Sequence, residues 1–152
     1  MTPMRILLVD DEPDMRASIA QALDLAGFAV RDFATPERIM DLVSFGFPGV
    51  VLTDIRMPGM DGLTLMNRIH EIDRDIPVIL ITGHGDVQLA VRAMREGAYD
   101  FVEKPFPASQ LAEIVARASD FRRLVLENRV LKAAAGQVDD MEQRLIGRST
   151  VM

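Results

Sequence analysis

The sequence predicts an α/β protein, a doubly wound (βα)5 sandwich around a five-stranded parallel sheet, extended by a long C-terminal helix. Over the first 105 residues, short apolar runs rich in Val and Ile alternate five times with amphipathic stretches. Runs of this kind are typical of strands buried on both faces, and strand–helix alternation implies parallel strands joined by right-handed crossovers. Beyond residue 107 the alternation stops, and one helical pattern continues to residue 145.

The strands are predicted from continuous apolar runs, of which the third and fourth are the clearest. The first run ends in Asp10 and Asp11, the third in Asp54, the fourth in Thr82, and the fifth close to Lys104. The five predicted strands cover residues 6–9, 28–33, 50–53, 78–81 and 99–102.

The helices are predicted from apolar stripes at helical spacing and from the residues that flank them. Gly27 and Gly97 follow two of the stripes and are stop signals, whereas Asp61 precedes a third and resembles a helix cap. The four predicted helices between the strands cover residues 13–26, a segment starting near 36, residues 62–72 and residues 87–95.

The long C-terminal pattern divides into two parts. Residues 108–118 fit an amphipathic helix that packs on its own domain. Beyond residue 121 we expect no further domain surface to cover, and the heptad spacing there predicts a coiled coil. Asn128 on this seam would fix the register, or would mark a partly exposed position. The alternating steps of three and four residues pass through Phe121, Leu124, Asn128, Leu131, Ala135, Val138, Glu142 and Leu145.

Composition narrows the class of protein. The chain has 152 residues, no Cys and a net charge of −6, which excludes disulfides and thiolate metal sites and disfavours nucleic-acid binding by this segment. No apolar run approaches the roughly 18 residues of a membrane span, and the N-terminal run is too short for a signal peptide. We therefore expect a cytoplasmic protein that binds neither a membrane nor nucleic acid through this segment.

The polar residues at the strand ends are the candidate functional site. In an open parallel sheet, ligands bind beyond the carboxyl ends of the strands. Asp10, Asp11, Asp54, Thr82 and Lys104 should therefore converge on one rim. Each has an ordinary structural alternative, such as Asp11 capping the helix after it, but their joint occurrence favours a site.

Three carboxylates at one rim predict a hard divalent cation such as Mg2+, which prefers oxygen ligands. A carboxylate is also a nucleophile toward phosphorus, so Asp54 can form an aspartyl phosphate. Lys104 and Thr82 could then hold the phosphoryl oxygens. The two histidines, His70 and His84, are interpreted as structural or incidental.

With these residues identified, the sequence resembles the receiver domain of bacterial response regulators. The matching stretches are LLVDDE, VVLTDIRMPGMDG, VILITGHGD and GAYDFVEKPF, in the family's order, and the resemblance covers about residues 4–121. The stretch DIRMPGMDG, the helical linker and LIGRSTVM further resemble the NtrC family of sigma-54 activators. Position 83 is Gly where the family usually has another small residue such as Ala, so a more mobile switch loop is expected.

The resemblance implies a role for each site residue. It makes Asp54 the phosphoacceptor, with Mg2+ on Asp11, Asp54 and the backbone carbonyl of Arg56, and Asp10 acting through water. Thr82 and Lys104 would bind the phosphoryl group. The aromatic switch position, which moves together with Thr82, corresponds to Phe101. The family often has a cis peptide bond before the proline that corresponds to Pro105.

The resemblance also implies partners and a domain plan. A sensor histidine kinase would donate the phosphoryl group, and homodimers would form through the fourth helix, fifth strand and fifth helix and through the linker seam, Phe121, Leu124, Asn128, Leu131 and Val138. Residues 1–121 would be the receiver, 122–145 a coiled-coil linker, and 146–152 the start of a truncated AAA+ domain. DNA and sigma-54 polymerase would be partners of the full-length protein only.

Two other functions compete with this interpretation. A phosphatase of the haloacid-dehalogenase type also uses a nucleophilic Asp with Mg2+, but it needs an acid two residues later, where this chain has Arg56. A dimerisation module that does not depend on phosphorylation is the second alternative. The chain lacks a phosphate-binding P-loop, so we expect no ATPase or other turnover enzyme, only self-phosphorylation and dephosphorylation.

Overall fold

A computed structural model describes residues 3–146 of the chain, and the side chains of residues 3–136. Five parallel strands form one sheet in the order β2-β1-β3-β4-β5, which is the predicted doubly wound arrangement. The strands are β1 (Arg5–Val9), β2 (Ala29–Phe33), β3 (Gly49–Asp54), β4 (Val78–Thr82) and β5 (Asp100–Glu103), and the helices are α1 (Pro13–Leu25), α2 (Glu37–Leu42), α3 (Gly62–Ile72), α4 (Val87–Glu96) and α5 (Ala108–Ile146).

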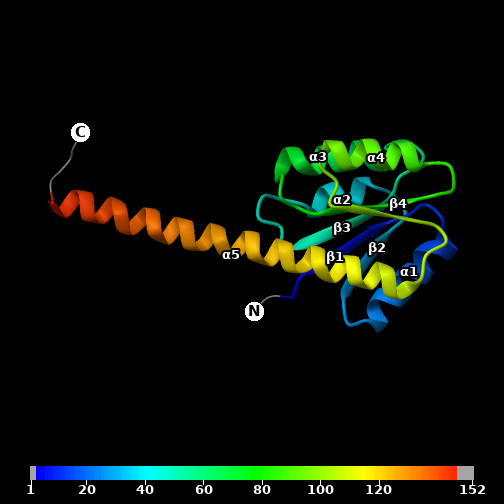
Figure 1. Ribbon diagram of the computed structural model, residues 1–152, viewed down its shortest axis with the longest axis horizontal. Helices are drawn as coiled ribbons and strands as arrows, with labels where there is room; N and C mark the ends of the chain where they lie inside the picture. Colours follow the sequence, from blue (N-terminus) through cyan, green and yellow to red (C-terminus); the bar gives the residue numbers. More distant parts are fainter. Residues whose placement is uncertain (1–2, 147–152) are drawn as a thin grey trace.

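The helices cover both faces of the sheet. One apolar cluster joins Leu7 and Val51 of the sheet to α2, α3 and α4, and the other joins Leu8 and Leu52 to α1 and α5. Figure 1 shows these layers, with α3 and α4 on one side of the strands and α1 and the first part of α5 on the other. Because successive strand residues point to opposite faces, neighbouring residues of one strand enter different clusters.

The central strands confirm the prediction of two-sided burial, since every residue of β3 and β4 is buried. The edge strands β2 and β5 are largely exposed or partly exposed, which explains their weaker apolar pattern in the sequence. Their boundaries differ from the predicted ones by one residue, as do the ends of most helices. Gly27 follows α1 with a φ of 95°, a conformation that suits glycine, so the predicted stop signal is confirmed.

Two predictions about helix starts had different outcomes. The side chain of Asp61 accepts a hydrogen bond from the Thr64 backbone N–H, so this residue caps α3 as expected. Asp11 does not cap α1, because Glu12 occupies the cap position and makes no side-chain capping bond. The structural alternative for Asp11 is therefore wrong, and its carboxylate is free for another role.

Helix α5 is continuous from Ala108 to Ile146 and extends well beyond the sheet. Its first part packs on the domain as predicted, with Leu111, Ile114, Val115 and Ala118 buried. The expectation that no domain surface remains beyond residue 121 is wrong, because Arg122 is fully buried and Arg129 still contacts the domain. The boundary at 121/122 itself stays a prediction.

Most of the predicted seam is exposed in the single chain. Leu124 and Leu131 are 64% and 68% exposed, and Asn128 is also exposed. Phe121 is only 41% exposed, because its ring lies 5.8 Å from that of Tyr99. The side chain of Val138 lies outside the described residues, as do residues 147–152 of the predicted AAA+ start at 146–152. No helix in the described part of the chain is long and apolar enough to span a membrane.

Candidate functional site

Three carboxylates lie together at the carboxyl ends of β1 and β3. One oxygen from each of Asp10, Asp11 and Asp54 lies within 4.8 Å of the others. The sheet causes this convergence, because β1 and β3 are adjacent and parallel and Val9 pairs with Thr53 at their ends. This position is also the point where the strand order reverses, which is where open α/β sheets bind ligands. The predicted acidic rim is thus present.

The three carboxylates differ in their surroundings. Asp10 is fully buried and Asp54 is almost so, whereas Asp11 is exposed. One oxygen of Asp10 accepts a hydrogen bond from the Glu12 backbone N–H at 2.9 Å, and the other, Oδ2, is buried without a protein partner. A buried acceptor of this kind is costly unless a cation or water satisfies it.

Burial raises the pKa of both Asp10 and Asp54. For Asp10 the Glu12 N–H opposes this effect, and for Asp54 the main opposing influence is the Lys104 ammonium. The neighbouring carboxylates add to the increase in both cases. The site therefore holds negative charge at a cost that a bound cation would offset.

Lys104 extends from the end of β5 toward Asp54. Its Nζ lies 3.5 Å from Asp54 Oδ2, and the peptide bond between Lys104 and Pro105 is cis, as the resemblance implied. The Lys104 backbone N–H also donates to the Thr82 carbonyl oxygen, which ties the ends of β5 and β4 together. An ammonium in this position is suited to holding a further anionic oxygen next to Asp54.

Thr82 and Phe101 occupy β4 and β5 beside the acidic rim. Asp54 pairs with Ile81, so Thr82 lies one residue further along the neighbouring strand. The Thr82 hydroxyl is buried and donates to the Val102 carbonyl oxygen at 3.2 Å. Phe101 is partly buried and packs against the cluster under α3 and α4. Their predicted roles as a switch pair stay predictions.

Arg56 follows Asp54 by two residues and makes a contact that the sequence did not predict. Its Nε donates to Asp86 Oδ1 at 2.7 Å, which joins the loop after β3 to the loop after β4. Its backbone N–H lies 3.4 Å from Asp54 Oδ1. An ion pair between residues 30 positions apart has no local sequence signal.

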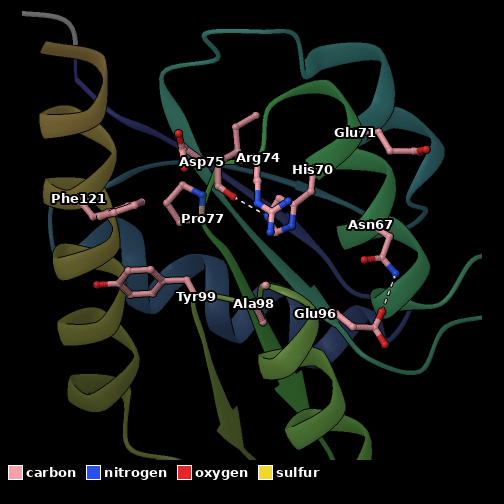
Figure 2. A pocket seen from close by; sticks show the side chains of 12 residues that line it. Asn67, His70, Glu71, Arg74, Asp75, Pro77, Glu96, Ala98, Tyr99 and Phe121 are labelled. Carbon is pink, nitrogen blue, oxygen red and sulfur yellow. Dashed lines mark hydrogen bonds between the residues drawn. The ribbon is translucent and has the colours of Figure 1, made fainter. Parts of the chain in front are cut away.

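A cavity of about 510 Å3 lies away from the acidic rim, at the amino ends of β4 and β5. Figure 2 shows Tyr99 and Phe121 on one side of it, with His70 and Glu96 facing them. Pro77 and Ala98 in its wall precede β4 and β5, whereas the acidic rim follows the strands. His70 Nε2 bonds to the Ile76 carbonyl, and burial lowers the pKa of this imidazole, which fits its predicted structural role.

The donor set fits the predicted cation. All three clustered side chains offer carboxylate oxygens, and no Cys exists in the chain. Hard divalent ions such as Mg2+ prefer these ligands and keep several waters. The unpartnered Oδ2 of Asp10 suits a bond to such a metal-bound water.

Comparisons with known proteins agree with this geometry. A family model described as the response regulator receiver domain matches residues 6–116. The C4-dicarboxylate transport transcriptional regulatory protein DctD of Pseudomonas aeruginosa is 53% identical over 148 residues, which is 97% of this chain and 32% of that protein. DctD of Rhizobium meliloti is 48% identical over 147 residues, again covering 97% of this chain and 32% of the relative. The chain thus spans about a third of these curated relatives.

Solved structures give the same result. The structure of FixJ-N is 41% identical with a TM-score of 0.71 and covers 79% of this chain and 96% of that one. The receiver domain of NtrX from Brucella abortus is 39% identical with a TM-score of 0.69, covering 76% and 98%. The chain therefore belongs to the receiver domain family of two-component response regulators and is related to the sigma-54 activators of the NtrC family.

Proposed function

We propose that this chain accepts a phosphoryl group on Asp54 from the phosphohistidine of a sensor kinase. The observation that carries the proposal is the contact between Asp54 and Lys104, 3.5 Å apart, inside a cluster of three carboxylates. One Asp54 oxygen attacks phosphorus, forming a P–O bond, while the P–N bond breaks and its electron pair stays with the leaving imidazole. Lys104 and Thr82 hold the oxygens of the transferred group.

The carboxylates and the main chain would together hold the cation. Asp11 and Asp54 would bind it directly, the Arg56 backbone carbonyl would supply a third oxygen, and Asp10 would act through bound water. When bound, Mg2+ offsets the negative charge that gathers where phosphate meets carboxylate. Asp10 keeps a firm orientation for this task, because its Oδ1 is held by the Glu12 N–H.

Readout takes place on a different surface. In this proposal Thr82 moves toward the new phosphate, Phe101 follows it inward, and the face formed by α4, β5 and α5 changes. Val87, Val91 and Met94 on α4 are each about two-fifths exposed, which supports that face as a dimer surface. The seam of α5 forms the second contact between two copies.

The proposal extends to the longer protein. By analogy with the relatives, an AAA+ ATPase and a DNA-binding segment would follow the receiver, and dimer rearrangement would control them. Similarity to DctD favours regulation of C4-dicarboxylate transport genes. The receiver would act in the cytoplasm and catalyse only its own phosphorylation and dephosphorylation.

Labelling with a small phosphodonor tests the chemistry. Acetyl phosphate with Mg2+ should increase the intact mass by one phosphoryl group, in a form that hydroxylamine removes, as expected of an acyl phosphate. Asp54→Asn should abolish the label, and Lys104→Met should slow labelling by on the order of 10²-fold. Asp41→Asn is the matched control, because Asp41 is an exposed residue of α2. Full labelling of Asp54→Asn would refute the assignment.

A second measurement separates signalling from static dimerisation. Beryllofluoride mimics an acyl phosphate, so with Mg2+ it should change the solution mass or shape of the parent chain but not of Asp54→Asn. Light scattering and small-angle X-ray scattering report these quantities. An unchanged assembly despite bound beryllofluoride would favour the module that does not depend on phosphorylation.

A further inference from the structure

A cluster of three charged residues ties α5 to the end of the domain opposite the acidic rim. It consists of Asp73, directly after α3, and of Arg122 and Arg129 on α5. The side chains of Asp73 and Arg122 are both fully buried, and that of Arg129 is 29% exposed. Ion pairs are rarely buried this completely unless each partner is well satisfied.

Asp73 is the acceptor at the centre of the cluster, and five hydrogen bonds reach its two oxygens. The backbone N–H groups of Gly46 and Asp75 donate at 3.0 and 3.1 Å. Arg122 Nη2 donates at 2.8 Å, and Arg129 donates through both terminal nitrogens, each at 2.8 Å. The two-pronged Arg129 contact fixes an angle as well as a distance.

The two arginines hold the helix differently. Arg122 also donates to the Phe47 carbonyl oxygen at 3.0 Å, so it joins α5 to the segment between α2 and β3 from inside the protein. Arg129 lies seven residues later on the same side of the helix, stacks over Phe45 at 4.6 Å and reaches Asp75 at 3.3 Å. Arg122 has no access to water, whereas Arg129 can exchange its partners for water.

We propose that these residues form a clamp that sets the direction of the linker half of α5, with Arg122 as the permanent anchor and Arg129 as a releasable arm. Between Arg129 and the end of the helix at Ile146, the axis extends by about 25 Å at 1.5 Å per residue. A small tilt at Arg129 is therefore a large displacement at Ile146. The receiver itself directs its linker, before a second copy binds the seam.

The alternative is that the linker takes its direction from a partner helix only. In that case contacts between the exposed leucines of the seam and the partner helix would set the direction of α5. The Arg129 contacts would have no effect on it. Substitution of Arg129 separates the two, because a direction imposed by a partner helix alone would not change when the Arg129 contacts are removed.

The absence of Cys allows two spin labels without background. Gln21→Cys places one on the exposed side of α1, and Ala134→Cys places the other on α5 beyond the clamp; both positions are exposed. Pulsed electron–electron double resonance on labelled protein, diluted in unlabelled protein, then reports distances within one chain. The intact clamp should give one narrow distribution, and Arg129→Gln should at least double its width.

Two further variants keep the test decisive. Arg117→Gln removes the same charge from an exposed position of α5 and should leave the distribution unchanged. Arg129→Lys keeps the charge but loses the two-pronged geometry, so an intermediate width is expected. Far-UV circular dichroism checks that all variants are folded. A broad distribution in the parent, no broadening in Arg129→Gln, or equal broadening in Arg117→Gln would each overturn the clamp.

Discussion

Replacing the buried anchor, Arg122→Met, should destabilise the folded receiver strongly. The methionine keeps an unbranched apolar stem but removes the guanidinium, which is fully buried and donates to Phe47 O and Asp73 Oδ2. The Phe47 carbonyl then lacks a donor from α5, and Asp73 depends on Arg129 and two backbone N–H groups. These losses occur in an environment from which water is excluded.

The size of the effect follows from these contacts. The Phe47 carbonyl still accepts the Gly49 backbone N–H at 3.0 Å, so losing its bond from Arg122 costs about 0.5 to 1.5 kcal/mol. The hydrogen bond to the charged Asp73 contributes about 1.5 to 3 kcal/mol. One opposing effect reduces the total, because Arg122 Nη1 is itself buried without a partner, and its penalty disappears in the variant. The expected net loss in the free energy of unfolding is about 2 to 4 kcal/mol.

Urea unfolding followed by far-UV circular dichroism measures this loss, since the chain has no Trp and a single Tyr. With an m-value of about 2 kcal/mol per M, the midpoint should fall by about 1 to 2 M. Arg117→Met, at an exposed position of the same helix, should change the free energy of unfolding by less than about 0.5 kcal/mol. A loss under about 1 kcal/mol in Arg122→Met would refute the view that the buried guanidinium anchors α5.

Two further predictions concern the acid response and the close packing beside the site. Burial alone would raise the pKa of Asp73, but hydrogen bonds from Arg129 and Arg122 outweigh it and hold the pKa well below its usual range. The stabilisation that ionised Asp73 contributes is therefore complete above its unfolded pKa of about 3.9 and is lost as pH falls toward its lowered folded pKa. Urea midpoints should fall more steeply below about pH 4 in the parent than in Asp73→Asn. Equal slopes would contradict this. Gly62→Ala places a Cβ 2.4 Å from the Asp54 carbonyl oxygen. It should therefore lower the free energy of unfolding in urea by about 1 to 3 kcal/mol and slow acetyl phosphate labelling. Values like those of the parent in both measurements would contradict the predicted clash.

The fold and the acidic rim were predictable because their signals are local. Each buried strand is a short apolar run, and each run ends in the polar residue that the rim requires. Once the strands are known to be parallel, their carboxyl ends must share one edge, which brings Asp10, Asp54 and Lys104 together without further information. The predicted boundaries of the edge strands differ from the observed ones by one residue, because only part of the surface of these strands is buried.

The contacts that reach across the fold were not predictable in this way. Arg122 and Arg129 lie in a helical pattern of charged and apolar residues where arginine normally faces water. Their partner Asp73 lies 49 and 56 positions away, and nothing in the sequence around it indicates burial. The heptad pattern also predicted that the helix leaves the domain after residue 121, whereas the contacts continue to Arg129. Apolar spacing carries no information about a long charged side chain that packs inward.

Helix α3 connects the acidic rim to the clamp formed by Asp73, Arg122 and Arg129. Its first residue, Gly62, donates its N–H to the Ile55 carbonyl at 2.9 Å, directly after the proposed phosphoacceptor. Its last turn leads into Asp73, the centre of the clamp. A rigid helix attached at both ends transmits displacement, but transmission alone shifts no equilibrium. A phosphoryl group on Asp54 would bias the Arg129 arm only if two positions of α3 differ in the free energy of their contacts with Asp73, because a ligand shifts a two-state element by its differential interaction and by nothing else.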